Sequence, residues 1–554
     1  MTTNQDTDQD LDAPGTDLPV DRCIDRRSFL TRMGVMSTLA GAAAVLPAID
    51  YRKAYAAGPG LSNDAYAQTV RPAALADPTE CTISEAATLI RTKKLSPVTL
   101  VEAYLARIQA YDADYYRAFN TVRAEALAEA AALAASRYIG PLHGIPLAIK
   151  DNYYTKGTRT TANSYIFEDF VPTFDASTVA NLKAAGGIVL GKMQMGPLAT
   201  TRATTPDGVT TTRNAWTPNN ASTNPGGSST GSATATAGRM ATSSIGTQTG
   251  GSITAPSNAQ GLTGLKPTVG RASLYGIIPL TYTRDHPGPL ARDAKDAAIM
   301  LQVMGGPDAN DPRTLGLPDM PDLVRAATPV RSKSGVVGLR WPTKIGIIPG
   351  YLSGTSATAQ ARTAMVNTFA SLGAQIVDVT LPDEWSLLTG GAFNNVRLPE
   401  RSEPFLEFLR QDVRLFGVSL GSWIQGLFLG GEDYLKGQRA KLLLMKRVLG
   451  DLFAQCDVVV QTDPVPFDIL GLPELAINIG FSPNAQGLPV PIGAILGGQP
   501  YAEDRLLALA AAFQAVTSFH LQRPADPLVE LAARSAFAGG GLQLTMEDVI
   551  AQTQ

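Results

Sequence analysis

Apolar and polar positions along the chain alternate between the period of a helix and that of a buried strand. Apolar residues such as Ile83, Ala87 and Ile90 predict amphipathic helices, whereas short unbroken apolar runs predict buried strands. Helices are predicted within 83–137, where Ser96-Pro97 starts a second one and 124–136 a third, and over 177–185, 294–304, 356–372, most of 403–455 and 504–517. Strands are predicted over 146–149, 187–190, 344–348, 375–380, 457–461, 475–480 and 490–496. This alternation predicts an α/β sheet core.

The chain is long enough, at 554 residues, for one large or two ordinary domains. No internal repeat is visible in the sequence, and no linker is long enough to separate two domains. We therefore expect one large mixed-sheet domain over 83–524, followed by a peripheral extension over 525–554.

Composition is that of an ordinary globular protein, with 44% apolar and 17% charged residues. A net charge of −3 gives no electrostatic reason to expect a nucleic-acid partner. The cysteines Cys23, Cys81 and Cys456 lie far apart, which argues against a disulfide framework or a structural zinc site. If residues 1–56 are removed as a signal segment, Cys81 and Cys456 are the two cysteines left. We do not expect a disulfide between them.

The chain has three histidines and no His-Glu-x-x-His motif, and its carboxylates show no spacing typical of magnesium or calcium sites. We therefore expect no metal site. The number of histidines does not exclude a Ser-His-Asp triad. However, His143, His286 and His520 stand beside glycine, proline or an Arg-Pro pair, and we expect structural roles for them.

The first 56 residues have the pattern of a targeting segment. A polar, acidic start is followed by Arg26-Arg27 with Phe29-Leu30 behind it, then by a moderately apolar run over 33–49. That run is too short and too rich in small residues for stable membrane insertion. With the small-x-small site at 54–56, the pattern resembles a twin-arginine signal, so we expect the twin-arginine export machinery as a partner and a periplasmic or secreted mature protein. The alternative is an incidentally basic amphipathic helix.

Residues 224–267 combine glycine with small and hydroxyl residues at high density. Glycine costs chain entropy, so a fold keeps it where the backbone turns tightly or where main-chain N–H groups approach another group closely. We expect that group to be the oxygen of a substrate acyl group.

Lys150 follows the predicted strand 146–149. Partial desolvation at the end of an apolar strand disfavours the ammonium and lowers its pKa. A useful base needs a fall from about 10.4 towards roughly 7–8. The alternative is an ordinary lysine that reaches solvent or pairs with Asp151.

Ser252 follows two glycines, so the backbone there can turn sharply and present the hydroxyl. The neighbouring amides, those of Thr249, Gly250, Gly251 and Ser252 itself, are predicted to form an oxyanion hole. Ser228 is both donor and acceptor, so it can take a hydrogen from Ser252 and pass one to Lys150. Each feature taken alone also fits a plain polar loop.

Together these segments resemble the amidase signature family. The matching blocks are GIPLAIKDN at 144–152, PGGSSTGS at 225–232, GTQTGGSI at 246–253, GLKPTVGR at 264–271 and GPLAR at 288–292. The resemblance extends over about 83–524. It implies a single α/β/α domain with a mixed, twisted central sheet flanked by helices, and no cofactor.

Carried over to this chain, the resemblance implies a nucleophile at Ser252, a bridging Ser228 that follows a cis peptide bond from Gly227, and a general base at Lys150. Ser229 is implied as a supporting hydrogen bonder. The chain departs from the family pattern at three positions, Thr230, Gln248 and Thr254, where relatives commonly have glycine or serine, an acid, and an arginine. If that acid and arginine pair in relatives, a neutral hydrogen bond is expected here.

The resemblance implies hydrolysis of a small-molecule carboxamide, with an acyl, aryl or amino-acid or peptide group, through an acyl-enzyme. An apolar segment over 405–429 fits either a pocket wall or simple core packing. Alternatives are an esterase, a subunit of a glutaminyl-tRNA amidotransferase, and a non-catalytic binding protein with the same fold. The sequence leaves the oligomeric state open, a homodimer included.

Overall fold

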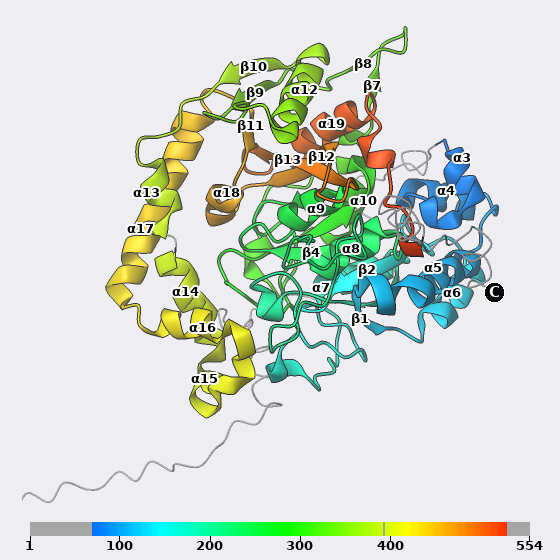
Figure 1. Ribbon diagram of the computed structural model, residues 1–554, viewed down its shortest axis with the longest axis horizontal. Coiled ribbons are helices and arrows are strands. Elements are labelled where there is room, and N and C mark those ends of the chain that lie inside the picture. The colour runs from blue at the N-terminus through cyan, green and yellow to red at the C-terminus, as the bar shows by residue number, and fades with distance from the viewer. Residues whose placement is uncertain (1–68, 392–393, 529–554) are drawn as a thin grey trace, which may run out of the picture. The chain divides into compact units, whose positions relative to one another are not determined.

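The computed structural model describes residues 69–391 and 394–528, which build a mixed α/β fold around a sheet of 11 strands (Figure 1). This confirms the predicted fold class. The predicted signal segment, Cys23 and most of the extension after Pro524 lie outside the described residues.

The strands of the large sheet lie in the order β1-β3-β2-β4-β6-β5-β12-β13-β11-β9-β10. They are β1 (Phe119–Val122), β2 (Pro146–Lys150), β3 (Ile188–Met193), β4 (Ser243–Gln248), β5 (Thr263–Lys266), β6 (His286–Ala291), β9 (Lys344–Ile347), β10 (Gln375–Asp378), β11 (Val458–Gln461), β12 (Glu474–Pro483) and β13 (Pro489–Gly498). A separate two-stranded sheet pairs β7 (Val330–Arg331) with β8 (Val337–Gly338).

The α-helices agree in place with the predicted ones, with shorter helices between them. They are α3 (Pro72–Ala76), α4 (Ile83–Arg91), α5 (Pro97–Tyr111), α6 (Ala126–Ala134), α7 (Ser177–Ala184), α8 (Thr230–Ala237), α9 (Thr254–Gln260), α10 (Ala294–Met304), α11 (Leu323–Ala326), α12 (Ala357–Ser371), α13 (Trp385–Thr389), α14 (Asn394–Ser402), α15 (Leu406–Gln411), α16 (Leu420–Leu427), α17 (Gly431–Arg447), α18 (Val465–Leu470) and α19 (Glu503–Gln514).

Two groups of helices cover the sheet. Helices α8 and α9 contact each other and pack on the central strands, α8 on β2, β3, β4 and β6 and α9 on β5, β12 and β13. Helix α10 packs on β5 and β6 and contacts α7 and α19 instead. The small residues of α8, all buried, allow this helix to approach the sheet closely.

The pairing of β2 with β4 decides where the site forms. These strands are parallel, with Leu147 opposite Ser243 and Ile149 opposite Ile245. Their carboxyl ends therefore share one edge of the sheet, which is where ligands bind in open α/β sheets. Lys150 ends β2 there, and Thr247 and Gln248 end β4.

Strands β1, β4, β5 and β6 were not predicted. Strand β4 reads SSIGTQ and β6 reads HPGPLA, and every residue of both is buried. Neither segment has the apolar run by which a buried strand is recognised, because close packing against helices requires small residues here. At Gly246 an added Cβ would lie 2.4 Å from Ser229 Oγ.

Part of the segment 405–429 packs in the core, which is one of the two uses considered for it. Phe405, Phe416 and Trp423 are buried and their rings contact one another, whereas Phe428 is 82% exposed.

Among the described residues no single helix has the length and hydropathy needed to cross a bilayer. The pair 413–427 and 431–452, bent by 94°, passes that test only when taken together.

Candidate active site

Lys150 contacts one of the two predicted serines directly. Its side chain is fully buried at the end of β2, and Nζ donates to Ser228 Oγ at 2.8 Å, to Thr247 Oγ1 at 2.8 Å and to the Thr247 carbonyl at 3.2 Å. All three acceptors are neutral oxygens. The lysine is therefore solvated by hydroxyl and carbonyl groups and has no carboxylate in contact within the described residues.

Burial lowers the pKa of Lys150 to about 7, against the opposing negative charge of Asp285. Because no carboxylate contacts the ammonium in the described part of the chain, the cost of desolvating the charge is not compensated. The alternative pairing with Asp151 is not formed: that carboxylate lies 3.3 Å from Nζ of Lys192 on β3.

Ser228 lies at the turn that leads into α8. The peptide bond from Gly227 to Ser228 is cis, as the family resemblance implied. The Ser228 carbonyl accepts from the amide of Gly196 at 3.2 Å. The Ser228 side chain is buried, and its hydroxyl oxygen is held by Lys150.

Ser229, for which the resemblance implied a supporting role, connects this turn to neighbouring segments through its hydrogen bonds. Its hydroxyl donates to the Thr247 carbonyl at 3.2 Å, which also accepts from Lys150. Its amide donates to the Ser252 carbonyl at 3.3 Å. The turn of Ser228 and the loop of Ser252 are thus joined through their backbones.

Ser252 lies between β4 and α9, and 8% of its surface is exposed. Among the described residues no hydrogen bond joins its hydroxyl to that of Ser228. The structure therefore contains the Lys150–Ser228 contact of the predicted relay, while the Ser228–Ser252 contact is not made.

The predicted oxyanion hole needs one correction. The Gly251 amide donates to Asp468 Oδ2 at 2.8 Å, so this N–H is not free for a substrate oxygen. The amides of Thr249, Gly250 and Ser252 have no acceptor within the described part of the chain. These three remain candidates for the oxyanion hole.

Gln248 and Thr254 form the neutral hydrogen bond expected from their departure from the family pattern. Gln248 Oε1 accepts from Thr254 Oγ1 at 3.2 Å and from the amides of Ile253 and Thr254 at 2.8 and 2.9 Å. Gln248 Nε2 donates to Asp468 Oδ1 at 2.8 Å and to Glu474 Oε2 at 2.9 Å. The loop that carries Ser252 is therefore held by hydrogen bonds on both sides of this residue.

The two carboxylates of this network were not recognised from the sequence. Lys266 lies 3.4 Å from both Asp468 and Glu474, and all three side chains are fully buried. Burial raises the pKa of Glu474 well above its usual range, against the charge of Lys266. The sequence signal for this network was a pair of acidic residues, 468 and 474, on either side of a Gly-Leu-Pro turn. Their link to the Ser252 loop is visible only in the three-dimensional contacts.

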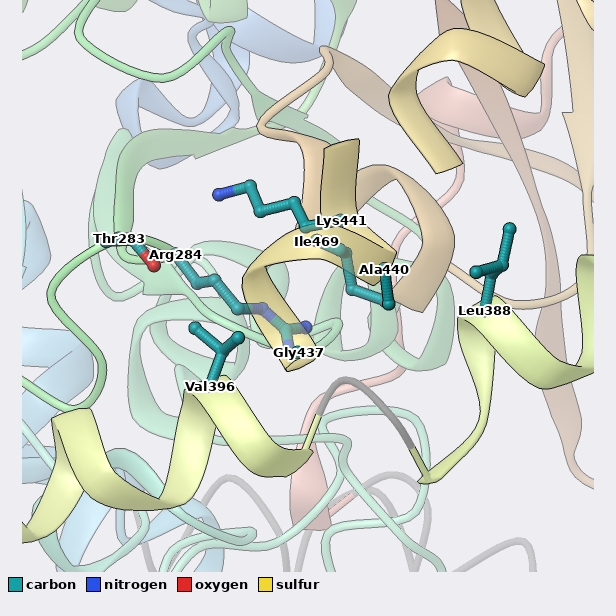
Figure 2. Close-up of a pocket in the computed structure, with 8 residues that line it drawn as sticks. All are labelled: Thr283, Arg284, Leu388, Val396, Gly437, Ala440, Lys441 and Ile469. Carbon is teal, nitrogen blue, oxygen red and sulfur yellow. The ribbon is translucent and has the colours of Figure 1, made fainter. Parts of the chain in front are cut away.

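Asp285 and Arg284 support the loop from the other side. The Thr249 hydroxyl donates to Asp285, which also accepts from the Leu280 amide at 2.7 Å. Arg284 Nη2 donates to the Thr249 carbonyl at 2.8 Å. Arg284 also lines a pocket with Thr283, Leu388, Val396, Gly437, Ala440, Lys441 and Ile469 (Figure 2).

Within the described residues, no hydrogen bond joins a histidine to Ser228 or Ser252. His286 is buried with Nδ1 3.2 Å from the Gln248 carbonyl, and burial lowers its pKa well below the usual range. His143 lies against the ring of Tyr138.

Residues 69–391 and 394–528 contain no group of three His, Cys, Asp or Glu side chains that could hold a metal ion. Cys81 and Cys456 are buried free thiols.

Comparisons with known proteins agree with this fold and site. The family model Amidase matches residues 99–461. The chain is 32% identical over 503 residues to a glutamyl-tRNA(Gln) amidotransferase subunit of Geobacter metallireducens and 35% identical over 496 residues to the corresponding protein of Geotalea daltonii, with 80% of this chain and 99% of each relative covered. The peptide amidase of Stenotrophomonas maltophilia superposes with a TM-score of 0.67 at 28% identity, over 81% of this chain and 99% of that one.

The chain is therefore an amidase-fold enzyme that acts on amide C–N bonds, and it belongs to the amidase family.

Proposed function

We propose that this protein is an amide hydrolase that works without a partner protein through an acyl-enzyme on Ser252. The observation that carries the proposal is the 2.8 Å contact between Ser228 Oγ and a fully buried lysine whose pKa is lowered to about 7. A lysine with this pKa is largely uncharged just above neutral pH, so it can accept a proton.

Lys150 removes a proton from Ser228 as Ser228 takes one from Ser252, and Ser252 attacks the carbonyl carbon. The free amides of the 249–252 loop stabilise the oxyanion that forms. The proton then returns through Ser228 to the departing nitrogen, so the amine or ammonia leaves neutral. Water hydrolyses the acyl-enzyme by the same relay. In this cycle Ser228 and Ser252 form their hydrogen bond when substrate is bound.

The test is the variant Ser252→Ala, assayed on a panel of aliphatic, aryl and amino-acid amides together with the matching esters. Loss of the nucleophile is expected to lower kcat by roughly 10⁴–10⁶-fold, as for other serine hydrolases, and to abolish labelling by a fluorophosphonate probe. The control is Ser222→Ala, which removes an exposed hydroxyl from a nearby loop. Retained labelling in Ser252→Ala contradicts the assignment of the nucleophile, and an unlabelled wild type favours a binding protein.

A second candidate is the ammonia-producing component of an amidotransferase, because the curated relatives at 32–35% identity are named as amidotransferase subunits. The two candidates differ in what the chain does alone. A stand-alone hydrolase turns over simple amides as a purified single chain. Release of ammonia from glutamine only when a partner protein and tRNA are added favours the amidotransferase. An esterase differs only in its leaving group, and the ester arm of the panel identifies it.

For localisation we propose export by the twin-arginine route, on the basis of Arg26-Arg27 and the apolar run behind them. Replacing both arginines by lysine is expected to retain the protein in the cytoplasm without changing its activity in a lysate. Equal amounts of the variant and the wild type outside the cytoplasm contradict export by this route.

A further inference from the structure

Four cationic side chains gather beside the loop that carries Ser252. They are Arg284 in the loop before β6, Arg397 and Arg401 on α14, and Lys441 on α17. Figure 2 shows Arg284 and Lys441 extending across one pocket from opposite sides. The two arginines of α14 act electrostatically on each other and on Arg284, and Arg284 acts on Lys441.

Arg401 has no counter-ion in contact among the residues that the structure describes. Its side chain is only 4% exposed, and its guanidinium lies over the ring of Trp423 at 5.3 Å. Within the described residues it forms no hydrogen bond or ion pair, and its buried Nε has no partner. Burial lowers the pKa of Arg401 to about 9, and the positive charge of Arg397 adds to this effect. A buried cation in this state is costly unless a ligand pairs with it.

The carboxylates near the cluster are occupied by other groups. Glu400 accepts from Thr283 and Tyr434. Asp285 accepts from the Thr249 hydroxyl and from two backbone amides. Asp468, whose charge acts on Arg284, lies 3.4 Å from Lys266. Within the described residues, neither Glu400 nor Asp285 forms an ion pair with Arg401.

The cluster adjoins the reaction centre. Arg284 holds the carbonyl of Thr249, three residues before Ser252. The charge of Asp285 acts on both Arg401 and Lys150, which brings the unpaired arginine into the electrostatic surroundings of the proposed base. Arg401 is thus linked to the surroundings of Lys150 through the charge of Asp285, and to the Ser252 loop through Arg284.

We propose that this enzyme selects amides that carry a carboxylate, and that Arg401, supported by Arg284 and Lys441, binds that carboxylate. The proposal rests on the hydrolase function given above. A planar guanidinium pairs with a carboxylate through two parallel hydrogen bonds, which gives orientation as well as affinity. Neutral amides of the same length leave Arg401 unpaired and are poorer substrates.

The experiment compares matched pairs of substrates on the full chain. In one arm the carboxylate is on the acyl side, in monoamides of dicarboxylic acids, against straight-chain primary amides of equal length. In the other arm it is on the amine side, in N-acyl amino acids, against N-acyl alkylamines. The variants are Arg401→Met, Arg401→Lys and Lys441→Met. The control is Arg410→Met, which removes an arginine that is 70% exposed on α15.

In the wild type, kcat/KM for the anionic member is expected to exceed that for the neutral member by about tenfold or more in one arm, as charge-assisted hydrogen bonds allow. Arg401→Met is expected to bring this ratio close to one, Arg401→Lys to retain part of it, and Arg410→Met to leave it unchanged. If Arg401→Met fails to fold, Lys441→Met is expected to lower the ratio by a smaller factor.

A ratio near one at every chain length in both arms overturns the proposal, as does a ratio that Arg401→Met leaves unchanged. Fluorophosphonate labelling of Ser252 separates this failure from failure of the proposed function. A labelled enzyme that hydrolyses neutral amides as well as anionic ones loses only the carboxylate specificity. An enzyme that is neither labelled nor active on any amide loses the hydrolase function itself.

Discussion

Lys150 and Lys192 lie on adjacent parallel strands, β2 and β3, and both side chains are fully buried. Lys150 donates only to neutral oxygens of Ser228 and Thr247. Lys192 donates to the Tyr153 carbonyl at 2.6 Å and to the Thr160 hydroxyl at 2.7 Å, and it lies 3.3 Å from Asp151.

Burial lowers the pKa of both lysines, to about 7 for Lys150 and to about 8 for Lys192, where Asp151 opposes the shift. Both lysines are fully desolvated, and their environments differ in whether a carboxylate contacts the ammonium group. A carboxylate in contact favours the charged form and makes the lysine a structural ion-pair partner. Without a carboxylate in contact, Lys150 loses its proton more readily, and in the proposed mechanism Ser228 supplies the path along which that proton moves.

The largest expected effect separates the two lysines by activity. Lys150→Met removes the proposed base, so kcat on a good amide substrate is expected to fall about 10²–10⁴-fold while the protein stays folded. Lys192→Met is expected to leave kcat, measured per folded molecule, within a few-fold of the wild type. Circular dichroism provides the check on folding. Equal losses in the two variants break the distinction between them.

The second prediction concerns stability, where the order reverses. Lys192→Met leaves the buried Asp151 without its cation and is expected to lower the free energy of unfolding by about 3–5 kcal/mol. The double variant Lys192→Met/Asp151→Asn removes both charges and is expected to recover part of that loss. Urea unfolding measures both values. No difference between the single and double variants contradicts a pairing between the two charges.

The third prediction uses pH to sharpen the contrast. In the proposed mechanism the uncharged form of Lys150 is the active one, so log kcat/KM is expected to rise with slope one below a pH of about 7 and to level off above it. The sign follows from the depressed pKa: at lower pH the lysine is protonated and cannot accept a proton. A profile that falls from pH 6 to 8 instead excludes Lys150 as the base.

The smallest effect is expected from Thr247→Val, which removes one hydroxyl acceptor of Lys150. That acceptor favours the ammonium, so its loss is expected to move the inflection to lower pH by about one unit or less, the worth of one hydrogen bond. Thr160→Val at Lys192 is the matched control and is expected to leave the inflection in place. A shift to higher pH contradicts the hydrogen-bond geometry at Lys150.

The fold was predictable where apolar period and strand length are clear, as at β2, β3, β11 and α10. It was not predictable at β4 and β6, whose serine, threonine, glycine and proline are selected by close packing around the site rather than by strand propensity. Packing between elements distant in sequence overrides the local signal there.

The candidate site divides in the same way. Lys150, Ser228 and Ser252 were singled out from the sequence because the motifs that carry the family resemblance are local, and the structure brings the first two into contact. The Gly251 amide was assigned wrongly because its acceptor, Asp468, belongs to a distant helix. The lack of a partner for Arg401 within the described residues is also invisible in sequence, since only the surrounding three-dimensional contacts define it.

The hydrogen bond from Gly251 to Asp468 spans 217 positions of the chain. During synthesis, at about 5–20 residues per second, the loop that carries Ser252 is therefore made roughly 10–40 s before Asp468, its hydrogen-bond acceptor. A nascent or truncated polypeptide that ends before α18 contains every proposed catalytic side chain. It lacks the Asp468 carboxylate that holds the backbone of the Ser252 loop. In the proposed mechanism, we therefore expect hydrolytic activity only after α18 and the strands that follow it have been made.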